Sequence, residues 1–161
     1  MTVMRQFFLA IAISLSAGVQ LLMGSANAED LEFSKAWVRA TIGQSNVTAG
    51  YLVIENKGKK DDLLLSVQTD VAAKTEMHQT NNGDGGVMRM RPVDDLRIPA
   101  GQSVAFRSGA DHLMLTGIET PLKAGDFIDL TLSFKLAGDE VVKAQVSRLM
   151  SSNEYWTSVS G

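Results

Sequence analysis

The sequence predicts an all-β domain of the β-sandwich or small Greek-key barrel type. Short segments in which apolar and polar residues alternate follow one another at close spacing, with turn-forming residues between them, which is typical of such folds. After Glu29, no segment of 12 or more residues repeats its apolar residues every 3.6 positions, so no long helix is expected. The composition, 45% hydrophobic and 20% charged with a net charge of −3, agrees with one globular domain in 161 residues.

The first 28 residues are expected to be a secretory signal peptide rather than part of the fold. Arg5 supplies the positive start, an apolar run covers residues 7–17, and Ala26–Ala28 is an A-x-A cleavage site. The alternative is a membrane anchor over residues 7–23, which is short for a span and is interrupted by polar side chains. With cleavage, the mature protein begins at Glu29 and works in the periplasm, an oxidising compartment.

Strands are expected along most of the mature chain. The clearest is Phe127–Leu136, in which apolar and polar residues alternate so that one face is buried. Residues 137–140 form a turn into a second alternating segment at Val142–Val146, which makes a hairpin. The other expected strands are residues 32–40, 51–55, 63–67, 87–93, 103–107 and 112–117. A single helical turn is considered at Val71–Lys74, and Trp37 is expected in the core.

One packed core is expected to hold residues 29–150 together, followed by a largely polar tail, residues 151–161. The chain contains no cysteine, which excludes disulfides, zinc–thiolate sites, cysteine nucleophiles and lipid attachment to a cysteine. A sequence pI near 5.3 and the lack of a block of like charges argue against nucleic acid as the main partner. The chain has neither a hydrolase nucleophile motif nor a phosphate-binding loop, so no enzymatic activity is predicted.

His112 and Met114 are the first candidate metal ligands. They lie two residues apart in an expected strand, so their side chains share a face, while Leu113 and Leu115 share the other. An imidazole beside a thioether forms half of a binding site for a soft metal. The alternative is a solvated histidine next to a methionine that fills the core, which is the more common meaning of such a short motif on its own.

A second histidine–methionine pair is expected from a hairpin. One short strand is expected to end at His78, and residues 81–86 form as strong a turn signal as the chain contains. A hairpin folded near Gly83 places His78 roughly opposite Met88 to Met90, and these two methionines share one face. The alternative, in which both methionines simply face the core, stays open at this point.

The chemistry of these side chains favours one metal. Imidazole and thioether groups are neutral, soft to borderline ligands that select Cu(I), and neither is lost to disulfide formation in an oxidising compartment. Calcium and magnesium require oxygen ligands, and zinc prefers cysteine, histidine and carboxylates. A blue-copper electron-transfer site needs a cysteine thiolate, which the chain lacks. The residues therefore predict a protein that binds Cu(I) and passes it on, rather than an electron-transfer protein.

The spacing of these residues resembles the signature of the periplasmic copper(I) chaperones called PCuAC. In that signature a His is followed by one residue, ten residues and a Met, and then by twenty-one residues and His-x-Met. Here His78, Met90, His112 and Met114 occupy the four ligand positions. Gln79 stands where many members have methionine. Further segments that resemble the family are residues 36–40, 50–56, 87–93, 98–101 and 121–126.

The resemblance implies a cupredoxin-like Greek-key β-sandwich that binds one Cu(I) through those four residues. It also implies delivery of copper to the binuclear site of cytochrome c oxidase subunit II, beside a Sco-type thiol protein. Met88 is the main alternative to Met90, and Met77, which is expected to point away from His78, ranks below both. Two other functions stay open, a periplasmic copper buffer or tolerance protein and a metal-free β-sandwich interaction module.

Overall fold

A computed structural model describes residues 30–82 and 88–148, and this part of the chain forms ten strands. They are β1 (Leu31–Arg39), β2 (Val47–Asn56), β3 (Asp62–Gln68), β4 (Lys74–Asn82), β5 (Met88–Val93), β6 (Leu96–Ile98), β7 (Ser103–Phe106), β8 (His112–Thr116), β9 (Phe127–Phe134) and β10 (Asp139–Ser147). The expected signal peptide, residues 1–28, and the expected tail, residues 151–161, lie outside the described residues. Within the described ranges, no helix is long and apolar enough to cross a membrane.

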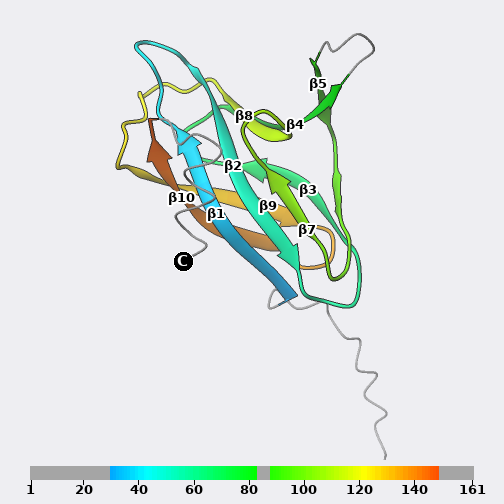
Figure 1. The fold of residues 1–161 in the computed structure, drawn as a ribbon. Coiled ribbons are helices and arrows are strands. Elements are labelled where there is room, and N and C mark those ends of the chain that lie inside the picture. The colour runs from blue at the N-terminus through cyan, green and yellow to red at the C-terminus, as the bar shows by residue number, and fades with distance from the viewer. Residues whose placement is uncertain (1–29, 83–87, 149–161) are drawn as a thin grey trace, which may run out of the picture.

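The strands form one sheet that curls into a nearly closed, barrel-like shape (Figure 1). The order is β5-β4-β8-β2-β1-β10-β9-β3-β6, and β7 pairs with β2 beyond the segment of β2 that pairs with β8. β1 and β10 pair in parallel, whereas the other described strand pairs are antiparallel. Neighbours in the sheet are often distant in sequence, as in a Greek key, and this confirms the predicted all-β fold class.

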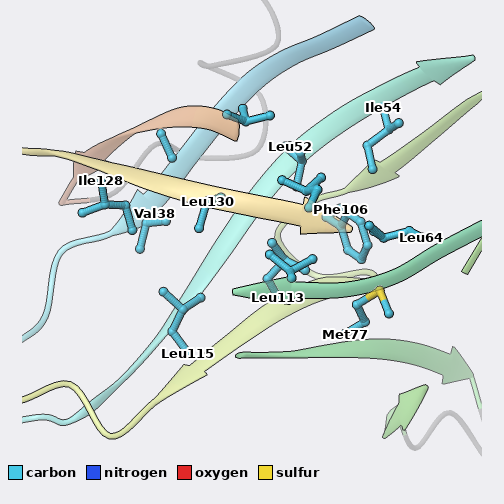
Figure 2. Close-up of a cluster of buried hydrophobic side chains, with 14 of the residues drawn as sticks. Val38, Leu52, Ile54, Leu64, Met77, Phe106, Leu113, Leu115, Ile128 and Leu130 are labelled. Carbon is cyan, nitrogen blue, oxygen red and sulfur yellow. The ribbon is translucent and has the colours of Figure 1, made fainter. Parts of the chain in front are cut away.

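The inner face of the sheet forms a continuous apolar core. Figure 2 shows buried side chains that come from many of the strands, among them Val38, Leu52, Leu64, Met77, Leu113 and Leu130. The period-two prediction for β9 and β10 is confirmed, because every second residue from Ile128 to Phe134 and from Val142 to Val146 is buried. Each fully buried aliphatic or aromatic side chain contributes about 1.5–3 kcal/mol, so this core can hold the chain without disulfides.

An extra residue in β1 changes which side chains face the core. Ser34 pairs with Val53 in β2, but Trp37 pairs with Tyr51, so two residues of β1 fit where β2 has one. The extra residue is Lys35, the one non-glycine residue with a positive φ (55°) among those that the structure describes. This β-bulge reverses the inward–outward alternation of the strand after that position.

The bulge is visible in the burial of the side chains on either side of it. Leu31 and Phe33 face the core before the bulge, whereas Val38 and Ala40 face it afterwards. Trp37 is buried, as expected, but it lies on the outer face of the sheet and is absent from the core cluster. If the residues of β1 alternated without a bulge, Trp37 would lie on the same face as Phe33, in the core.

Two local expectations differ from the structure. The helical turn considered at Val71–Lys74 is not formed, because residues 70–71 make a simple turn and β4 begins at Lys74. β6 was not expected, since its three residues are too few to show a period. β6 pairs with β3 and ends the sheet on the side opposite β5.

Candidate metal centre

Two adjacent strands place both histidines of the protein side by side. His78 lies in the middle of β4 and pairs directly with His112, the first residue of β8. The centroids of the two imidazole rings are 5.6 Å apart and the rings are nearly parallel, with an interplanar angle of 12°. The side chains are 9% and 8% exposed, which is unusual burial for histidine outside a functional or fully hydrogen-bonded site.

The histidines lie on the outer face of the sheet, opposite the core. Met77 is buried in the core cluster, as is Leu113, and each neighbours a histidine along its own strand. Because side chains alternate between faces, His78 and His112 project together on the other side. This confirms two expectations, that His112 shares a face with Met114 and that Met77 points away from His78.

Both candidate methionines lie on the same face as this pair. Met114 in β8 pairs with Glu76, and Met90 in β5 pairs with Thr80. Glu76 and Thr80 are each two residues from His78, so both methionines are diagonal neighbours of His78, within reach of long side chains. His78 is therefore the central position among the four candidate ligands.

The site is closed on one side and open on the other. Both histidines are buried and Met114 is partly buried, whereas the Met90 side chain is 58% exposed. Met90 lies on the β4–β5 hairpin, which projects from the body of the sheet (Figure 1). The side chain of Met88, the expected alternative to Met90, lies outside the described residues.

The hairpin register differs from the expected one by two residues. His78 pairs with Pro92 rather than with Met88 to Met90, and it lies in the middle of its strand rather than at the end. The pairs from Met77–Val93 to Asn82–Met88 centre the connection on position 85. Residues 81 and 82 carry turn-forming side chains, but they extend β4 instead. The shift is even, so Met90 still shares a face with His78.

Hydrogen bonding distinguishes the two imidazoles. Nδ1 of His112 lies 3.0 Å from the carbonyl oxygen of Ala110, a contact that requires the Nδ1–H tautomer and leaves Nε2 with its lone pair free. Nδ1 of His78 is buried and has no hydrogen-bond partner among the described residues. A buried polar atom without a partner costs free energy, and with the proton on Nε2 the lone pair of His78 Nδ1 is available to a ligand.

The turn before β8 is tied to β4. The backbone N–H of Thr80 donates to the Asp111 carboxylate at 3.0 Å, and the Thr80 hydroxyl donates to the Ala110 carbonyl oxygen at 2.9 Å. The same carbonyl contacts the imidazole of His112. Hydrogen bonds therefore join the two histidine-bearing strands next to His78 and His112, and they limit the relative movement of these strands.

A carboxylate lies beside the histidines. Glu76 forms a 2.7 Å ion pair with Lys74. This hydrogen-bonded contact lowers the pKa of Glu76 below its ordinary value, and His78 makes a smaller contribution in the same direction. Among the described residues, no group of three or more histidine, cysteine, aspartate or glutamate side chains could hold a metal ion. The thioethers of Met90 and Met114 are the further soft-ligand groups at neighbouring positions on this face.

The comparisons with known proteins place the chain in a family. The LpqE-like family model matches residues 31–146, which is most of the chain. This chain belongs to the LpqE-like family. A similar relative is Lxx21020 of Leifsonia xyli subsp. xyli, named as a lipoprotein, which is 30% identical over 127 residues, 79% of this chain and 75% of the relative. The uncharacterised RP573 of Rickettsia prowazekii is 31% identical over 121 residues, 73% of this chain and 66% of that protein.

Solved structures of PCuAC domains match this LpqE-like chain. The copper-bound PCuAC domain from PmoF2 has a TM-score of 0.64 at 20% identity, over 74% of this chain and 94% of that domain. Apo-DR1885 from Deinococcus radiodurans has a TM-score of 0.60 at 26% identity, over 91% of this chain and 98% of that one. Its Cu(I) form has a TM-score of 0.58 at 27% identity, over 86% and 87%. These matches confirm the PCuAC resemblance and the cupredoxin-like fold.

Sequence reasoning on the LpqE-like chain missed the residues that support the histidines. Glu76 and Thr80 lie two positions on either side of His78, and period two alone would have placed them on its face. The contact between Asp111 and Thr80 could not be found this way, because it joins segments 31 residues apart through the β4–β8 pairing.

Proposed function

We propose that this protein is a copper chaperone that binds one Cu(I) at His78, Met90, His112 and Met114. The observation that carries the proposal is the buried, parallel histidine pair with two methionines at diagonal positions on the same face. Two neutral imidazoles and two thioethers form a ligand set that suits Cu(I) better than any hard cation. The similarity to Cu(I)-bound DR1885 at 27% identity supports the same cargo for this chain.

The two histidines use different ring nitrogens in this proposal. His112 keeps Nδ1–H on the Ala110 carbonyl and offers Nε2 to copper, as a metal-bound histidine does when its other nitrogen donates a hydrogen bond. His78 offers Nδ1, the buried atom that has no partner among the described residues. Copper binding would then satisfy a polar atom that the apo fold leaves without a hydrogen bond.

Release of the ion follows from the exposure of Met90. A recipient that approaches the open side meets the 58% exposed thioether first. Thioether–copper bonds are neutral and can be exchanged one at a time for the ligands of the recipient, while the buried histidines hold the ion until the last step. No covalent change in the protein is needed, so the function requires transfer and no catalysis.

The proposed recipient is the binuclear copper site of cytochrome c oxidase subunit II, with a Sco-type thiol protein acting beside it. The proposed compartment is the periplasm, reached through cleavage of the signal peptide at Ala26–Ala28. Both proposals follow from the PCuAC resemblance and from a ligand set without thiols, which suits an oxidising compartment. Failure of oxidase assembly as the main defect of a deletion strain would support the recipient, whereas copper sensitivity alone would favour a buffer or tolerance protein.

The first test is an anaerobic Cu(I) titration of the mature protein against a chromophoric Cu(I) chelator. We expect one tight equivalent for the wild type, and a clear loss of affinity in Met114→Ala, on the order of 10-fold or more, because one thioether ligand is missing. Met77→Leu is the matched control, since Met77 is buried in the core on the opposite face and leucine conserves its volume.

Three results would separate the possible functions. Loss of affinity in Met114→Ala but not in Met77→Leu supports the site. Equal loss in both variants would mean that the methionines act only through packing. A wild-type protein that takes no copper from the chelator would sink the proposal and favour the metal-free interaction module.

A further inference from the structure

A row of aromatic side chains continues the histidine pair across the outer face of the sheet. In the β2–β8 ladder, Gly50 pairs with Leu113, and both face the core, where a Cβ on Gly50 would lie 3.5 Å from the Leu113 side chain. The next residue along β2 is Tyr51, and the preceding residue along β8 is His112. Both therefore lie on the outer face, at neighbouring positions in adjacent strands.

Tyr51 is fixed in place from its other side. Its ring stacks on Trp37 of β1 with centroids 4.4 Å apart and an interplanar angle of 30°. Trp37 and Tyr51 are only 5% and 4% exposed, although they lie outside the core cluster. A guanidinium N–H of Arg39, at Nη2, donates to the tyrosine hydroxyl at 3.4 Å. A ring held by stacking and by a hydrogen bond is a rigid neighbour for the residue beside it.

His112 lies between two rings that come from different strands. β8 lies between β4 and β2 in the sheet, so His78 flanks His112 on one side and Tyr51 flanks it on the other. The single contact of Nδ1 with the Ala110 carbonyl fixes one atom of the imidazole. His112 and Tyr51 are both buried, although they lie on the outer face, so a ring at the neighbouring position on each side would restrict rotation of the imidazole about that atom.

We propose that Tyr51 is a positioning residue for the copper site, which holds the His112 imidazole in the orientation that presents Nε2 to Cu(I). This inference rests on the proposed function, because it concerns the same ligand. The β-bulge at Lys35 contributes to this arrangement, because it places Trp37 on the outer face of the sheet, where Trp37 stacks on Tyr51. Bulges near functional sites commonly re-aim a side chain in this way.

The test compares three variants by anaerobic Cu(I) titration against a chromophoric chelator. Tyr51→Leu removes the ring, whereas Tyr51→Phe keeps it and loses only the hydroxyl that accepts from Arg39. We expect Tyr51→Leu to lower Cu(I) affinity about 10-fold and Tyr51→Phe to lower it less than about threefold, as for residues that orient a metal ligand. Leu52→Ala is the control for lost stability, because Leu52 lies next along β2 but faces the core.

A spectroscopic readout keeps the inference testable if Tyr51→Leu folds poorly. Trp156→Phe leaves Trp37 as the sole tryptophan of the chain, so its emission reports on the Trp37–Tyr51 stack. We expect the emission to change on Cu(I) addition and to level off at one equivalent, because Tyr51 stacks on Trp37 and lies beside His112 in the β2–β8 ladder. The same titration in Tyr51→Phe is expected to keep the change.

The outcomes distinguish this inference from the proposed function. Tight Cu(I) binding by the wild type with equal affinity in Tyr51→Leu would overturn the positioning role and leave the chaperone proposal standing. Tight binding with no change in Trp37 emission would also count against it. A wild type that binds no Cu(I) would overturn both, and the titration of the wild type alone reveals that case.

Discussion

At the scale of single residues, the histidine pair combines burial with an unmet bonding requirement. A buried ring nitrogen without a partner costs about 1–3 kcal/mol, yet Nδ1 of His78, beside His112, has none within residues 30–82 and 88–148. Its position is imposed by strand pairing, since the two residues are direct partners in the β4–β8 ladder. An unsatisfied Nδ1 of His78 next to the imidazole of His112 is an arrangement to which an electrophile such as a metal ion can bind.

The pH dependence of copper binding follows from the two imidazoles. Protons and Cu(I) compete for the lone pairs of the imidazole nitrogens, so affinity is expected to be lower in acid than at neutral pH. The measurement is chelator competition at about pH 7.5 and about pH 5, and His112→Ala is expected to show a shallower dependence because one competing group is gone. Equal affinity of the wild type at both pH values would contradict a site with two histidine ligands.

The two histidine–methionine pairs could be recognised from residue type and spacing, whereas the choice of His78, Met90, His112 and Met114 as a set rests on the PCuAC resemblance. Tyr51 carries no such signal, since a tyrosine in a strand is ordinary. Its proximity to His112 appears only once β2 and β8 are known to pair.

At the scale of elements, the β-bulge in β1 decides what lies on each face of the sheet. The alternation expected for residues 32–40 would place Trp37 and Phe33 on the same side, and the extra residue at Lys35 separates them. Sequence periodicity could not reveal this, because alternation assumes that no residue is inserted. The register of the β4–β5 hairpin could not be predicted for a different reason. The turn signal covers residues 81–86 and is too long to fix the position at which the hairpin folds.

Substitutions at Lys35 test the bulge. A β-branched residue tolerates positive φ poorly, so Lys35→Val is expected to lower the free energy of unfolding by about 1–2 kcal/mol relative to Lys35→Gly. Both variants remove the lysine side chain, and their difference therefore isolates the backbone conformation. Thermal or urea unfolding measures it, and equal stability of the two variants would mean that the positive φ is not retained in solution.

At the scale of the whole molecule, the continuous core supplies most of the stability, and exposed polar contacts of Asp61 add a smaller contribution. Asp61 accepts a backbone N–H from Ala100 at 2.8 Å and also pairs with Arg97. The Ala100 hydrogen bond, followed by Arg97, lowers the pKa of Asp61 below its ordinary value. These contacts tie the segment before β3 to the turn after β6.

Acid is expected to weaken the contacts that Asp61 makes with Ala100 and Arg97. Because the pKa of Asp61 is lowered in the folded state, its stabilisation is complete above the ordinary aspartate value of about 3.9 and is lost as the pH falls through the folded value. Asp61→Asn is expected to lower the melting temperature at about pH 7, and the difference from the wild type is expected to shrink below about pH 4. Circular dichroism melts measure this, with Asp139→Asn as a control for loss of one surface charge. A constant difference at all pH values would contradict the assignment.

The fold class could be predicted because it depends on many residues at once. Alternation in β9 and β10 and the close spacing of turns are each repeated along the chain, so single irregularities do not change the conclusion. β6 and the exact partners of β4 depend on a few residues and on long-range pairing. Such features depend on contacts between segments that are distant in sequence rather than on a local pattern.

The edge position of β5 has a consequence for self-association. β5 ends the described sheet, and an unpaired strand edge invites another chain to add a strand and begin an aggregate. The strand carries exposed Arg89 and Arg91 and a proline, Pro92, which cannot donate a backbone hydrogen bond. Like charges on approaching copies repel, and the proline interrupts a new ladder. The strand that carries the exposed Met90 side chain is therefore protected against edge-to-edge association.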